Sequence, residues 1–163
     1  MQRTTLPSVP ARRRAAPVTV AVVTALVAAV AFALGPVLWP PAAATPAPSD
    51  GQLPWFVALA AAEALVLGLG VSFALFGGPV VRRLASPRRA LAVRAGLVWV
   101  LASWWPHDNL HIANGSDLGG LLAIEYGFHL TVMAAGLAVV WALLPVREAT
   151  ERRAPEAAGS AGA

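Results

Sequence analysis

"VTVAVVTALVAAVAFALGPVLW", residues 18–39, contains no charged side chain. A helix needs ~20 consecutive apolar residues to cross the hydrocarbon core of a bilayer. The rest of the chain suits the same environment, since 58% of its 163 residues are hydrophobic and only 12% are charged. Soluble domains are typically about one-quarter charged. The sequence therefore predicts an integral membrane protein.

Three further apolar runs follow, at residues 55–76, 91–105 and 118–144. Residues 91–105 form the weakest run, because about fifteen residues span only ~22 Å of a core that is ~30 Å thick. This run also contains Arg94, which we expect to reach for the lipid headgroups. We predict an all-α protein with four transmembrane helices in an antiparallel bundle, covering residues 18–145. The flanking segments 1–17 and 146–163 are predicted to be disordered cytoplasmic tails.

The arginines predict the orientation of the chain, because cytoplasmic loops of membrane proteins carry an excess of basic residues. The connections 40–54 and 106–117 contain no arginine. We therefore expect a multi-pass protein of the cell (inner) membrane with both termini cytoplasmic. Eleven of the twelve arginines then fall on the cytoplasmic side: Arg3, Arg12, Arg13, Arg14, Arg82, Arg83, Arg88, Arg89, Arg147, Arg152 and Arg153.

The same distribution argues against nucleic-acid binding, because no basic patch is left over for a folded surface. A cleaved signal peptide ending near residues 42–44 is the competing interpretation of the first run. We expect the run to stay uncleaved, because it exceeds the ~7–15 apolar residues of a signal sequence.

Several chemistries are excluded or disfavoured by composition. The chain has no cysteine, which excludes disulfides, thiolate metal sites and cysteine nucleophiles. It contains no P-loop, no dinucleotide-binding glycine motif and no nucleophile elbow. Three histidines are too few for an eight-histidine di-iron oxygenase. The sequence therefore favours a binding role over an enzyme, without settling the point.

One segment gathers the polar chemistry of the chain: WWPHDNLHIANGSDLGGLLAIEYGFHL, residues 104–130, which holds all three histidines. His107 and His111 are four residues apart, with Asp108 between them. Pro106 suits the first turn of a short interfacial helix, which would point both imidazoles to one side. Asn114-Gly115 indicates a turn, and Ser116 or Asp117 can cap the helix that follows.

Four ionisable residues fall inside predicted spans, where charge is costly and usually functional. Arg94 can reach the headgroups, whereas Glu63, Glu125 and His129 have no such explanation. Glu125 and His129 are four residues apart and share one helix face. Glu63 lies at a similar depth, in the outer half of the second span. The sequence leaves open whether Glu63 faces the Glu125/His129 pair.

Our leading hypothesis is a metal site, because imidazoles and carboxylates at this spacing suit divalent zinc or copper. The candidate ligands are His107, His111, Glu125 and His129, with Asp108 and Glu63 as additional ligands or hydrogen-bond acceptors. Such a protein would act as an accessory or assembly factor.

Three alternatives stay open. Glu63, Glu125 and His129 could serve a proton-coupled transporter or an electron-transfer subunit. A haem could bind His129 and either His107 or His111, although paired axial ligands usually lie deeper, on two different helices. The chain could also be a structural subunit of a larger membrane complex. The expected partners are the lipid bilayer and either another membrane protein or further copies of this chain.

Overall fold

The structure is a computed structural model that describes residues 17–43, 45–115 and 117–144. Over these residues the chain is helical with connecting loops and no strands. The tails expected at residues 1–17 and 146–163 lie outside this part, apart from Pro17, where the first helix begins. The helices are α1 (Pro17–Leu38), α2 (Leu53–Phe76), α3 (Gly78–Leu84), α4 (Pro87–Ala102), α5 (Trp104–Asn114) and α6 (Leu118–Leu143).

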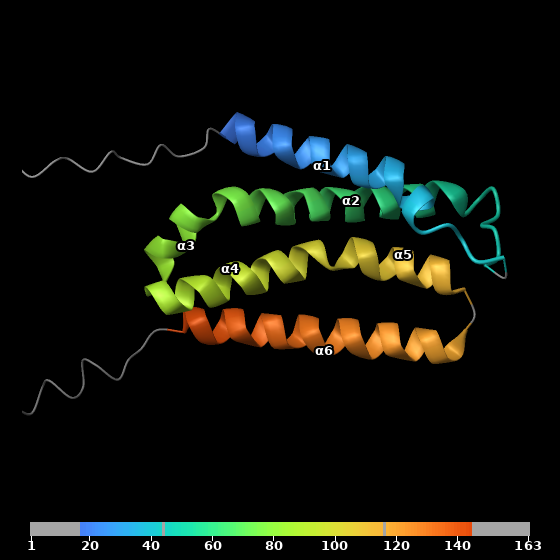
Figure 1. Cartoon of the computed structure of the whole chain (residues 1–163). Helices are drawn as coiled ribbons and strands as arrows, with labels where there is room; N and C mark the ends of the chain where they lie inside the picture. Colours follow the sequence, from blue (N-terminus) through green and yellow to red (C-terminus); the bar gives the residue numbers. More distant parts are fainter. Residues whose placement is uncertain (1–16, 44, 116, 145–163) are drawn as a thin grey trace, which may run out of the picture.

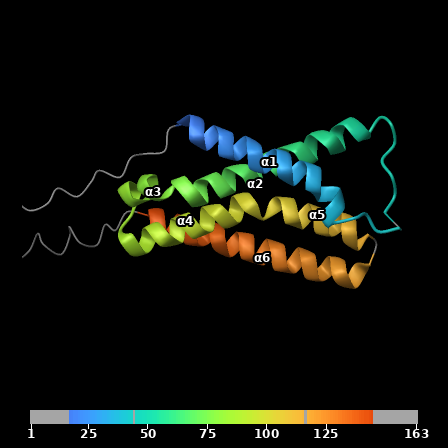
Figure 2. The same cartoon turned by 45° about the horizontal axis from the view of Figure 1, so that its top comes forward.

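The long helices form a row of antiparallel neighbours (Figures 1 and 2). α1 packs on α2, α2 on α4 and α4 on α6. The short α3 connects α2 to α4 at one end of the row, here called the α3 end (Figure 1). The loop between α1 and α2 and the turn between α5 and α6 lie at the opposite end, here called the turn end.

Three helices are long and apolar enough to cross a membrane: α1, α2 and residues Gly119–Leu143 of α6. Their bounds differ from the predicted runs by two residues or fewer. The predicted run 91–105 is not among them. α4 has only 16 residues, or ~24 Å of helix, and carries three arginines. Four spans were expected, and three of the described helices are long and apolar enough to cross a membrane.

α4 and α5 lie end to end beside α6 (Figures 1 and 2). The break between them falls at Ser103 and has a local cause. Pro106 has no N–H, so it cannot donate to the carbonyl of Ala102 as a regular helix requires. The helical hydrogen bonds resume at the next residue, where the His107 N–H donates to the Ser103 carbonyl at 3.1 Å.

Arg94 stabilises the join between α2 and α4. Its guanidinium donates to the carbonyl of Ala74, in the last turn of α2. Carbonyls in the last turn of a helix have no partner within that helix. Arg94 therefore caps α2, a role that its position in the sequence did not indicate.

Small residues set the close approach of α1 and α2. A Cβ atom on Gly68 would collide with the carbonyl of Thr24. One turn further along α2, the Ser72 hydroxyl lies 2.8 Å from that of Thr24 in a buried hydrogen bond. Polar contacts of this kind between membrane helices contribute about 0.6–2 kcal/mol. Large apolar side chains, such as Val18, Leu130 and Leu137, cover the outside of the row, as expected for a surface in contact with lipid.

Candidate metal centre between α5 and α6

A tight turn brings the two halves of the site together. Gly115 adopts φ +62°, a conformation that glycine reaches without steric cost. The Asp117 carboxylate accepts hydrogen bonds from the N–H groups of Gly119 and Gly120, both at 3.2 Å. The Asn114 side chain donates to the Asp117 carbonyl at 2.8 Å. The predicted turn and the predicted Asp117 cap are both confirmed, while Ser116 lies outside the described residues.

α5 presents two imidazoles to α6. The ring centroids of His107 and His111 are 4.5 Å apart, as their one-turn spacing predicts. The helix itself differs from expectation, because it begins at Trp104, before Pro106. It also continues the line of α4 within the row (Figure 1).

Glu125 of α6 contacts histidines on both helices. Its Oε1 atom lies 3.1 Å from His111 Nε2. Its Oε2 atom lies 2.9 Å from His129 Nδ1, and the same ring nitrogen is 2.9 Å from the Glu125 carbonyl oxygen. Glu125 therefore joins the two helices, and His129 holds its carboxylate from the far side.

Three side chains converge closely enough to share an ion. One ligand atom each from His107, His111 and Glu125 lies within 4.8 Å of the other two. Ligands bound at 2.0–2.2 Å in a tetrahedral site are roughly 3.4 Å apart. Small side-chain rotations that shorten the longest of these separations by little more than ~1 Å would bring the three ligand atoms to that spacing. His129 is 55% exposed and is not one of these three side chains. It contacts the group through the Glu125 carboxylate.

Glu63 and Asp108 extend the site toward α2. Asp108 Oδ1 lies 3.8 Å from His107 Nε2. Glu63, Asp108, His107 and His111 also line one pocket of about 320 Å³. Glu63 thus shares this pocket with Asp108 and the histidines of α5.

Comparisons of the chain with protein-family models, with curated proteins and with solved structures find no match. The functional inference therefore rests on the geometry of these side chains.

Aromatic residues form the apolar wall of the site. The His107 ring stacks on Phe128 with centroids 3.8 Å apart, and Trp104 meets Phe128 edge to face at 4.9 Å. His107 is consequently only 8% exposed. Neither Trp104 nor Phe128 was among the predicted site residues. The signal for Phe128 was its position on α6, three residues after Glu125 and directly before His129.

Proposed function

We propose that the protein is a four-span protein of the inner membrane in which α4 and α5 together make the third crossing. The two helices have 16 and 11 residues, so their combined length is ~41 Å. Arg82, Arg83, Arg88 and Arg89 lie in α3 and the first turn of α4, at the α3 end. Basic residues mark the cytoplasmic side, so both termini would be cytoplasmic and the turn end would face outward.

We propose further that His107, His111 and Glu125 bind one divalent transition metal in the outer half of the membrane. The convergence of their ligand atoms within 4.8 Å carries this proposal. Two imidazoles and a carboxylate suit zinc or divalent copper, whereas monovalent copper prefers sulfur ligands. In this role the protein handles a metal ion as an accessory or assembly factor.

Zinc titration of the purified protein tests the proposal. We expect one zinc per chain in the wild type and loss of this binding in the His111→Ala/Glu125→Ala variant. Asp50→Ala is the matched control, because it removes a carboxylate from the outer loop. Circular dichroism confirms that each variant keeps its helices. Equal zinc binding by the wild type and the double variant would refute the proposal.

A second candidate function is proton transfer, favoured by the line of contacts between titratable groups. His129, Glu125 and His111 are joined by contacts of 2.9 and 3.1 Å, and His107, Asp108 and Glu63 line a pocket that extends from His111 toward α2. Series of neighbouring Asp, Glu and His side chains are a common feature of membrane proton pathways. Proton flux into proteoliposomes should fall in Glu63→Gln if this function holds. Unchanged flux would exclude Glu63 from it.

A further inference from the structure

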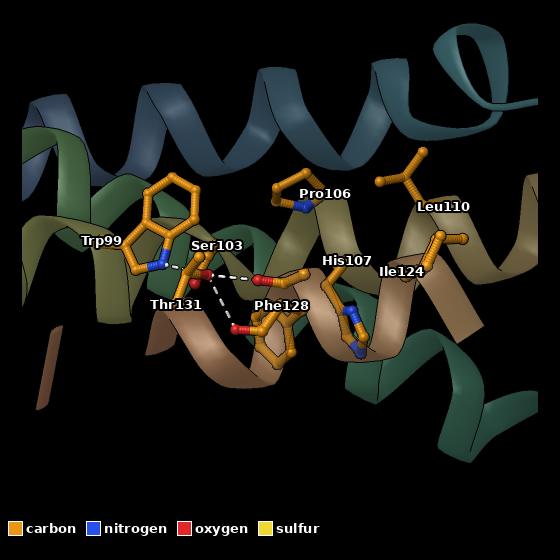
Figure 3. Close-up of a pocket in the computed structure, with 10 residues that line it drawn as sticks. Trp99, Ser103, Pro106, His107, Leu110, Ile124, Phe128 and Thr131 are labelled. Atoms are coloured by element: carbon orange, nitrogen blue, oxygen red, sulfur yellow. Dashed lines mark hydrogen bonds between the residues drawn. The ribbon is translucent and has the colours of Figure 1, made fainter. Parts of the chain in front are cut away.

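A second pocket, of about 510 Å³, lies between α4–α5 and α6 on the other side of His107 (Figure 3). Ligand pockets of small molecules typically measure about 300–1,000 Å³. Its lining is mainly apolar and includes two aromatic side chains, Trp99 and Phe128. Trp99 is also 47% exposed on the outside of the row, so the pocket lies next to a surface that lipid would cover.

Two residues of this lining each carry a buried polar atom that has no hydrogen-bond partner among the described residues: Ser103 Oγ and His107 Nδ1. Both atoms are covered by neighbouring atoms, so a side-chain rotation is needed to turn them into the pocket. Ser103 is 6% exposed and His107 is 8% exposed. The residues are four apart, so they lie on the same side of adjacent helical turns. Buried polar groups without partners are rare in proteins, and each calls for an explanation.

A third polar group of the same pocket, the Thr131 hydroxyl, does have hydrogen-bond partners. The Thr131 hydroxyl donates to backbone carbonyls of its own helix, at 2.7 Å for Gly127 and 3.0 Å for Phe128. It also accepts from Trp99 Nε1 at 3.1 Å (Figure 3). Thr131 therefore needs nothing from a ligand. Ser103 and His107 are the two side chains that would gain from one.

The depth of these two groups limits the ligand. Ser103 lies eleven residues before the end of α5 at Asn114, or ~16 Å along the helix from the turn end. A phospholipid keeps its polar headgroup at the surface, so only its acyl chains could reach this depth. The ligand must instead carry an oxygen into the apolar zone. A flat ring with oxygen substituents and an apolar tail meets that requirement and also suits the Trp99 and Phe128 faces.

We propose that this pocket binds the ring of a membrane quinone or quinol, and that rotation of the Ser103 and His107 side chains brings Ser103 Oγ and His107 Nδ1 into hydrogen bonds with its ring oxygens. A quinone oxygen accepts hydrogen bonds and a quinol hydroxyl also donates them, so either form complements a hydroxyl and an imidazole. The other ring nitrogen, His107 Nε2, lies on the Asp108 side at 3.8 Å. The quinone pocket and the proposed metal site thus meet at one imidazole.

Binding of a short-tailed naphthoquinone to the detergent-purified protein, measured by equilibrium dialysis, tests this inference. Gly127 lines the pocket and has nothing within 4 Å of its Cβ position, so Gly127→Leu should fill the pocket without a clash. We expect at least tenfold weaker binding in this variant. Gly136→Leu is the matched control, because Gly136 has equal space on the same helix. Its binding should match that of the wild type.

Ser103→Ala tests the hydrogen bond. We expect binding to weaken about fivefold, as for the loss of one hydrogen bond. A naphthalene with the same tail but no ring oxygens should bind the wild type and Ser103→Ala equally. The reduced quinol is measured in parallel to show which redox form is preferred.

Two results would overturn the inference. One is wild-type affinity in Gly127→Leu. The other is equal binding of the naphthoquinone and the oxygen-free analogue, which would mark the pocket as a simple acyl-chain groove. Zinc binding is measured in the same samples. Because Ser103 and Gly127 lie outside the three metal ligands, failure of quinone binding would leave the metal proposal standing.

Discussion

Glu125 is the residue on which the cluster depends, because its two carboxylate oxygens contact histidines of different helices. Oε1 lies 3.1 Å from His111 and Oε2 lies 2.9 Å from His129. If a metal ion binds between Glu125 Oε1 and His111, the contact of Oε2 with His129 keeps the carboxylate oriented toward the metal. This division gives His111 and His129 different roles, which substitution can separate.

His129→Ala should weaken zinc binding without abolishing it. Loss of a group that orients a ligand typically costs 10–100-fold in metal affinity, whereas loss of His111 removes a ligand outright. Competition with a chromophoric zinc chelator measures both affinities. If His129→Ala lost as much affinity as His111→Ala, His129 would have to be a ligand itself.

The histidine pairs could be predicted from the sequence, since the spacing of His107 and His111, and of Glu125 and His129, determines which side chains share a face. The contacts between residues of different helices could not be predicted. α2 and α6 are apolar on all sides, so hydropathy does not show how each helix is rotated about its axis. The rotation of α2 decides that Glu63 shares a pocket with Asp108, a pocket that Glu125 does not line.

At the scale of elements, the turn between α5 and α6 positions the site. Gly115 reverses the chain and Asp117 caps α6 through two backbone N–H groups. Both features were predictable, because turn and capping residues act locally. The extent of α5 was harder to predict. Its first two residues, Trp104 and Trp105, resemble the end of a membrane span, and only the missing N–H of Pro106 marks the break at Ser103.

Asp117→Ala should destabilise the protein, since loss of an N-cap typically costs about 1 kcal/mol. Zinc affinity should fall with it, because α6 would be held less firmly against α5. Thermal unfolding in detergent measures the stability, with Asp50→Ala as a control that removes an acidic side chain outside the cap. Equal melting temperatures for the two variants would show that the cap contributes nothing.

At the scale of the whole molecule, the arginines of α3 and of the first turn of α4 lie at the opposite end of the row from the polar site. α3 and the start of α4 carry four arginines, while the loop between α1 and α2 carries none. The loop is tied to α5, because the Ala42 N–H and the Thr45 hydroxyl both donate to the Ile112 carbonyl, at 3.2 and 3.1 Å. The proposed orientation would therefore expose the turn end outside the cytoplasm.

Single-cysteine labelling tests that orientation, and the cysteine-free chain gives no background. Ala47→Cys, in the exposed outer loop, should react with a membrane-impermeant maleimide in intact cells. Arg83→Cys, in α3, should react only after the cytoplasm is opened. The reverse pattern would invert the topology and place the metal site on the cytoplasmic side.

The X-ray absorption spectrum of the zinc-loaded protein tests the metal site most directly. It should show a shell of nitrogen and oxygen ligands at about 2.0–2.1 Å, with the outer-shell scattering of two imidazoles. In His111→Ala, loaded at higher zinc concentration, that scattering should fall to one imidazole. A wild-type spectrum without imidazole scattering, or one that His111→Ala leaves unchanged, would contradict a site built from His107, His111 and Glu125.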